Sequence, residues 1–187
     1  MSDLSHEKPH MEKFPAVVLG RRDYAIAVCL LVLALRAGEV AAITLDDIDW
    51  RAGTLVIRAG KTRRGTRLPL PAQVAVALAD YLRRGRPKTT ERAVFVHHRA
   101  PRGARGEASL IRVAVRRAYA RAGLDPRLTG THVLRHTAAS RLLRTGASMK
   151  EIADVLRHRS LDTSAIYAKV DRTALQGVAL AWPEVQP

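Results

Sequence analysis

The chain of 187 residues is poor in cysteine, in aromatic side chains and in long apolar runs. Its only cysteine, Cys29, excludes an internal disulfide, and the surrounding run AIAVCLLVLAL predicts a small core residue. That run of about a dozen residues is too short to span a bilayer. The start MSDLSHEKPH lacks the charged-then-apolar pattern of a secretory signal, so we expect a cytoplasmic protein without a membrane partner. Only two Phe and four Tyr are present, which argues against a base-stacking platform for single strands.

Acidic residues are also scarce. Seventeen Asp and Glu oppose 32 Lys and Arg, which gives a formal net charge of +15 at pH 7. So large a basic excess favours a polyanionic partner, most often nucleic acid. A coding bias is the alternative, because most of the basic residues are Arg, and Ala and Gly are frequent. Apolar residues make up 47% of the chain, as in one soluble domain with a sizeable core.

The spacing of apolar and turn-forming residues predicts an α+β fold that is mainly helical and holds one small antiparallel sheet of three strands. The segments DDIDWRAGTLVIR and GTRLPLP favour short strands around a basic turn at residues 60–65. Thr131 is expected to cap a helix that ends before Gly146, and Ser148 and Glu151 form a capping-box pattern. Helices are expected over residues 21–35, 72–84, 107–122 and 172–181, and a short one ends at Ile43. Three more are expected to begin at Thr131, at Ser148 and near Asp162.

The segment THVLRHTAASRLL crowds His132, Arg135 and His136 onto one helix face. Two histidines four residues apart can ligate zinc, but the permanent charge of Arg135 between them would repel a cation. We therefore predict neither a metal site nor a cofactor. An anion fits better, because the first turn of a helix has free N–H groups and an Arg adds a planar fork for phosphate oxygens. A solvated helix face is the alternative.

Four other residues outside this segment are candidates for the same chemistry. Arg36 follows the apolar helix in LALRAGEVAAI, where a surface pair with Glu39 is the alternative to an anion ligand. Lys61 begins the turn GKTRRGTRLPL, and its flexible ammonium either reaches into a groove or sits on a charged hairpin tip. His158 and Tyr167 lie in VLRHRSLDTSAIYAKV, where Tyr167 is alternatively a plain apolar-face residue.

In this order and spacing, the segments resemble the signature blocks of the tyrosine recombinases, the phage-integrase family. The resemblance covers roughly residues 20–175, which correspond to the family's catalytic domain, and residues 1–19 are expected to be a tail. It implies cleavage of double-stranded DNA through a 3′-phosphotyrosyl intermediate, with no small-molecule substrate. The residues that match the family's catalytic set are Arg36, Lys61, His132, Arg135, His158 and Tyr167.

Each member of this set has an expected role. Arg36, Arg135 and His158 supply donors to the phosphate oxygens in the transition state. Tyr167 is the nucleophile, and its ordinary pKa of about 10 calls for a base or a cationic pocket. His132 is the candidate to accept that proton, and Lys61 the candidate acid for the departing 5′ oxygen. His136 is expected to pack or hydrogen-bond locally.

Further arginines are expected to contact the DNA backbone. Three of them follow Lys61 in the same turn and strand. Two i, i+4 basic rows lie on a predicted helix, one formed by Arg112 and Arg116 and the other by Arg117 and Arg121. A solvated helix face explains these rows equally well. Arg157 stands where the family commonly has glycine, and it either crowds His158 or adds a phosphate contact. The predicted DNA-binding residues are Arg63, Arg64, Arg67, Arg112, Arg116 and Arg157.

The family usually carries a helical DNA-clamping domain before the catalytic one, and about 20 residues cannot form it. We therefore expect a catalytic domain without the clamp. Residues 176–187 are expected to dock on a neighbouring protomer, within a tetramer on DNA, or to fold back on their own domain. The alternatives are a catalytically weak integrase remnant, a type IB topoisomerase activity, and a DNA-binding regulator with a helix-turn-helix over 141–170.

Overall fold

The computed structural model describes residues 16–58, 65–124 and 130–157. The chain divides into two compact units, residues 1–138 and 139–187, and each is described by itself. The helices expected near Asp162 and over 172–181 lie outside the described residues. The elements are α1 (Ala16–Val32), α2 (Ala37–Ala42), the 3-10 helix η2 (Leu45–Asp47), β1 (Ile48–Asp49), β2 (Thr54–Arg58), β3 (Gly65–Pro69), α3 (Ala72–Arg84), α4 (Ala108–Arg121), α5 (Thr131–Arg144) and α6 (Met149–Leu156).

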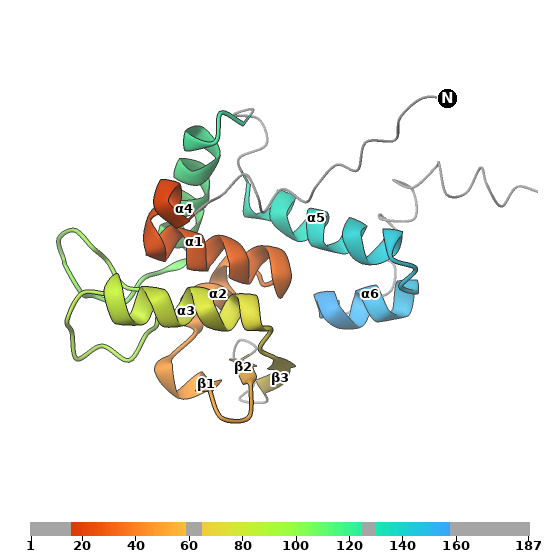
Figure 1. The fold of residues 1–187 in the computed structure, drawn as a ribbon, viewed down its shortest axis with the longest axis horizontal. Coiled ribbons are helices and arrows are strands. Elements are labelled where there is room, and N and C mark those ends of the chain that lie inside the picture. The colour runs from red at the N-terminus through yellow and green to blue at the C-terminus, as the bar shows by residue number, and fades with distance from the viewer. Residues whose placement is uncertain (1–15, 59–64, 125–129, 158–187) are drawn as a thin grey trace, which may run out of the picture. The chain divides into compact units, whose positions relative to one another are not determined.

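Helix α1 is the centre of the first unit. It contacts both α3 and α4, and Figure 1 shows α1 and α3 side by side. Because α1 is covered on more than one side, its residues 25–31 are all buried rather than striped. The prediction for Cys29 is confirmed, since its side chain is fully buried. Burial raises the pKa of the Cys29 thiol to about 12, which leaves it an inert core residue.

The expected small sheet is present, with its three antiparallel strands in the order β1-β2-β3. In β2 the side chains of Leu55 and Ile57 are buried while Arg58 is exposed, as the two-residue period of a strand requires. At the end of η2, directly before β1, the buried Asp47 carboxylate accepts hydrogen bonds from Thr44 and, at 2.7 Å, from Arg58 Nε. Burial alone would raise the pKa of Asp47, but these bonds outweigh it and lower the pKa.

The predicted helix over 72–84 is confirmed as α3, and the one predicted over 107–122 is α4. The first helix differs most from prediction. It begins at Ala16, contains a non-helical Gly20, and ends at Val32. The chain then turns at Ala34, whose φ is +50°, although residues 33–35 stay buried. The apolar pattern of the sequence continues to residue 35 because residues 33–35 are buried, although the helix has already ended.

The turn between α5 and α6 follows the sequence pattern closely. Helix α5 begins at Thr131 itself, one residue earlier than a cap at that position would give. At its other end Gly146 has a φ of +87°, and Ala147 N–H donates to the Leu142 carbonyl at 3.0 Å. This is the Schellman arrangement, in which glycine is favoured because its φ is positive. Ser148 and Glu151 form the predicted capping box of α6.

Arg157 ends α6 in the left-handed conformation, with φ +51° and ψ +47°. This explains why glycine is preferred at this position, since a Cβ costs about 1 kcal/mol there. The half-buried Arg157 side chain donates from Nη1 to the Val155 carbonyl at 3.1 Å, which offsets part of that cost.

Replacing Arg157 with glycine should therefore stabilise the protein by about 0.5–1 kcal/mol, which corresponds to a rise in Tm of about 2–3 °C. Thermal denaturation followed by circular dichroism measures this shift. Lys150→Gly, in the helical first turn of α6, is the matched control and should lower Tm, because glycine is a poor helix former at ordinary helical angles. A lower Tm for Arg157→Gly would show that the side-chain contacts outweigh the backbone strain.

Candidate functional site

Arg135 is the only buried lysine or arginine in the described ranges 20–58, 65–124 and 130–157, with a relative exposure of 6%. It lies one turn into α5, and its Nη1 donates to the carbonyl oxygen of Ala34, 101 residues earlier in the sequence. Because a guanidinium carries five donors on a planar fork, one arginine can hold a carbonyl and face an anion together. Arg135 therefore links α5 to the segment between α1 and α2.

Arg36 stands two residues beyond Ala34, at the N-cap of α2. Its Nη1 lies 3.1 Å from Glu39 Oε1, and its backbone N–H donates to Glu39 Oε2 at 2.7 Å. The surface pair considered as an alternative is therefore present. Its existence does not remove Arg36 from the candidate site, because the Arg36 side chain remains 47% exposed. Residues 34–36 thus bring the two candidate arginines to one short stretch of backbone.

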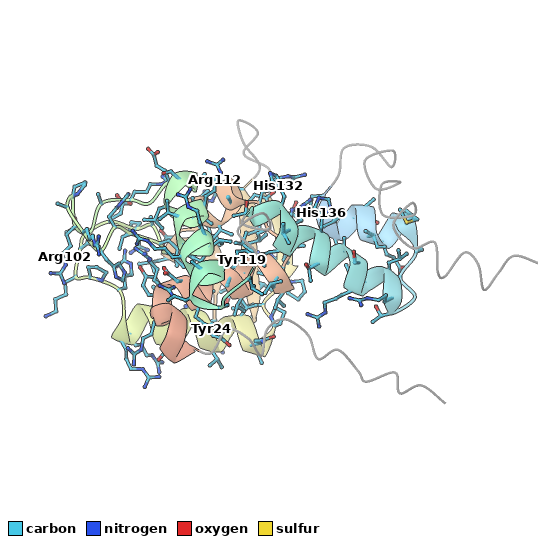
Figure 2. All side chains as sticks on the ribbon, turned by 90° about the horizontal axis from the view of Figure 1, so that it is seen from above. Tyr24, Arg102, Arg112, Tyr119, His132 and His136 are labelled. Carbon is cyan, nitrogen blue, oxygen red and sulfur yellow. The ribbon has the colours of Figure 1, made fainter. Side chains whose placement is uncertain are left out.

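His132 lies in the first turn of α5, at the edge of a cavity of about 370 Å³. Figure 2 shows His132 and Arg112 at this place, where the start of α5 meets α4. The helix N-terminus and the exposed arginines both favour an anion in this cavity. The structure therefore brings Arg112 and Arg116 together with His132. The cavity is lined by Ser109, Arg112, Val113, Arg116, Gly130, Thr131 and His132.

The two basic rows predicted on α4 are not equivalent. Arg121 Nη2 lies 3.0 Å from the Oδ2 atom of the buried Asp23, so it fixes α4 to α1. Arg117 faces a second cavity, of about 250 Å³, on the other flank of α4. Sequence reasoning missed this cavity, although the arginine-rich loop over 99–106 was a visible signal. The second cavity is lined by Arg22, His97, His98, Arg99, Ser109, Leu110, Val113 and Arg117.

The remaining predicted residues divide into two groups. Arg67 is exposed on β3, where Nη1 donates to Thr54 Oγ1 at 3.4 Å across the sheet, and Arg157 belongs to the second unit. His136 is exposed on α5. Outside the described residues lie Lys61, Arg63, Arg64, His158 and Tyr167, so their roles stay predictions.

Two absences apply to the described part of the chain alone. Within it, no three His, Cys, Asp or Glu side chains gather in a way that would hold a metal ion. None of its helices has both the length and the apolar character needed to cross a membrane.

Known proteins resemble this chain in sequence and in fold. A sequence model of the Phage integrase family matches residues 9–173. The protein y4rA of Sinorhizobium fredii, which carries an integrase/recombinase name, is 51% identical over 166 residues, or 88% of this chain and 40% of y4rA. Tyrosine recombinase XerC of Oceanobacillus iheyensis is 32% identical over 84% of this chain and 52% of XerC.

The crystal structure of XerA recombinase matches the fold with a TM-score of 0.77 at 28% sequence identity. The match covers 95% of this chain and 64% of the XerA chain. This similarity confirms the predicted mainly helical α+β fold with its three-stranded sheet. The chain spans from two fifths to about half the length of y4rA and XerC.

Proposed function

The chain belongs to the phage integrase family, and from this premise we propose that it cleaves and rejoins double-stranded DNA as a tyrosine recombinase of a mobile element. Integration, excision and transposition all use this reaction. The observation that carries the proposal is the bond from the buried Arg135 to the Ala34 carbonyl. It ties one candidate phosphate ligand to the backbone that bears the other, Arg36.

The arginines neutralise the negative charge of the phosphodiester, which otherwise repels a nucleophile. Arg36 and Arg135 donate to the non-bridging oxygens, and they stabilise the extra charge of the pentacoordinate transition state. Arg135 is held by burial and by the Ala34 carbonyl, so little reorganisation is needed when the phosphate arrives. The Glu39 carboxylate restrains Arg36 in the same way.

The remaining steps are proton transfers and the covalent bond. Tyr167 Oη attacks phosphorus while His132 takes up the phenol proton, and Lys61 protonates the departing 5′ oxygen. His158 adds a third donor to the phosphate. The product is a 3′-phosphotyrosyl link with a free 5′-hydroxyl. A second 5′-hydroxyl then attacks this link, so the bond energy is retained and religation needs no ATP.

The DNA duplex is held by backbone contacts around this site. Arg112 and Arg116 line the cavity beside His132. In the proposal, Arg63, Arg64 and Arg67, which follow Lys61 in the sequence, also contact the DNA backbone. Arg157 adds a phosphate contact in the second unit. Strand exchange between two duplexes uses four copies of the chain, which residues 176–187 join by docking on a neighbouring protomer.

A covalent trap tests the proposal. The full chain is incubated with nicked duplexes of randomised sequence, which lose the 5′-hydroxyl fragment after cleavage, and adducts are separated on a denaturing gel. Tyr167→Phe should form at least about 100-fold less covalent adduct than the wild type. It should still bind DNA normally, because it lacks only the nucleophilic oxygen. Tyr24→Phe is the matched control and should form the adduct.

The outcomes separate the competing functions. An adduct that survives in Tyr167→Phe would contradict the assigned nucleophile. DNA binding without any adduct would identify a DNA-binding regulator or an inactive remnant. An adduct that relaxes supercoiled DNA without joining two duplexes would indicate a topoisomerase activity in place of recombination.

A further inference from the structure

The second cavity beside α4 has no role in the reaction described above. Three arginines reach it from separate parts of the first unit: Arg22 from α1, Arg99 from the loop before α4, and Arg117 from α4 itself. We infer that this cavity is a second backbone-phosphate site, which grips duplex DNA at a distance from the cleaved phosphate. The inference rests on the proposed function, because it assumes that the chain's polyanionic partner is DNA.

The positive charge of the cavity is available to an outside anion. Arg22 is largely buried, and its Nη2 atom lies 3.0 Å from Asp23 Oδ1. Because this ion pair already uses its charge, Arg22 lines the cavity and is not counted as an anion ligand. Arg99 and Arg117 are both exposed, and neither forms an ion pair within the part of the chain that the structure describes. Two guanidinium groups that form no ion pair with a described carboxylate are well suited to bind phosphate oxygens.

One histidine of the cavity, His98, belongs to an aromatic stack. The His98 ring stacks on Tyr81 with ring centroids 5.9 Å apart, and Tyr81 stacks in turn on the buried Phe95. Burial and the neighbouring Arg22 lower the pKa of His98, which favours the neutral form of its ring. The arginines therefore supply the permanent positive charge of the cavity, beside the stack of His98, Tyr81 and Phe95.

The position of the cavity favours a long polyanion. Ser109 and Val113 line both cavities, so the two adjoin across the outer face of α4. Figure 2 shows Arg102, on the loop that follows Arg99, and His132 on opposite sides of α4. A helix with its side chains is about 10 Å wide, more than a single phosphate can bridge. A DNA duplex, with its continuous rows of phosphates, can fill both cavities at once, and an acidic protein segment is the competing ligand.

The test is the salt dependence of duplex binding by the full chain with Arg99→Gln and Arg117→Gln combined. Removing one phosphate-binding arginine should reduce the slope of log Kd against log salt by about 0.9, so we expect a slope lower by about 2 for the double variant. Arg51→Gln with Arg83→Gln is the matched control. It removes the same charge from exposed arginines outside both cavities, and its slope should stay near the wild-type value. Thermal denaturation verifies that both variants fold.

A slope in Arg99→Gln/Arg117→Gln equal to that of the control would overturn the inference. Unchanged duplex binding together with weaker binding of polyaspartate would also overturn it, in favour of an acidic protein partner. At saturating DNA the rate of adduct formation per bound complex should match the wild type, because neither residue touches the reacting atoms. A wild-type chain that binds duplex but forms no Tyr167-dependent adduct would refute the proposed function and leave the slope comparison intact.

Discussion

Replacing Arg135 with alanine should lower the free energy of unfolding by about 2–3 kcal/mol and also abolish DNA cleavage. The stability loss follows because Arg135 is buried and its charged donor holds the Ala34 carbonyl, which would be left without this bond. For a chain of this size the loss corresponds to a fall in Tm of about 5–10 °C. The loss of cleavage follows because the same guanidinium is a phosphate donor in the proposed mechanism.

Two further variants separate these effects. Arg141→Ala, an exposed position in the last turn of α5, should change the stability by no more than about 0.5 kcal/mol. Arg135→Lys keeps the charge but replaces the planar fork with a compact ammonium, so it should restore part of the stability and little of the cleavage. A wild-type Tm for Arg135→Ala, measured by thermal denaturation, would show that the buried bond does not stabilise the fold.

Arg36→Ala should lower the rate of DNA cleavage by about 100-fold to 1000-fold and leave the free energy of unfolding almost unchanged. Its ion pair with Glu39 is partly exposed, and such pairs contribute at most about 1 kcal/mol. The rate falls because a donor aimed at the developing charge is missing from the transition state. Single-turnover cleavage of a nicked duplex at saturating protein measures this loss directly.

Arg51→Ala removes an exposed arginine from the β1–β2 turn and provides the matched control, with a cleavage rate close to that of the wild type. Duplex binding by Arg36→Ala should weaken only by the contribution of one phosphate contact. Normal cleavage by Arg36→Ala would remove Arg36 from the catalytic set and leave its pair with Glu39 as a helix cap alone.

Local patterns predicted the elements of the fold well. The helix over 72–84 and the capping box at Ser148 follow from short-range spacing, because amphipathic period and capping act within a few residues. The end of the first helix was predicted three residues too late. The buried Leu33 and Leu35 continue the apolar pattern, and burial alone does not distinguish a helix from an extended segment.

For the candidate site, the sequence proposed residue types, but it could not give their environments. The sequence placed Arg135 on an anion-binding or solvated helix face, whereas its side chain is buried against Ala34. That contact joins residues 101 positions apart, and no local pattern contains it. The rows on α4 show the same limit, since Arg121 pairs with the distant Asp23 while Arg116 lines a cavity with His132.

The most direct test of the proposed chemistry is to identify the residue that carries the DNA. The trapped adduct is digested with nuclease and trypsin, and the nucleotide-bearing peptide is sequenced by mass spectrometry. We predict that the nucleotide is on Tyr167, in the tryptic peptide SLDTSAIYAK over residues 160–169. A nucleotide on Tyr24, Tyr81 or Tyr119 would contradict the assigned nucleophile, and no modified peptide from a preparation that binds DNA would contradict the proposed function.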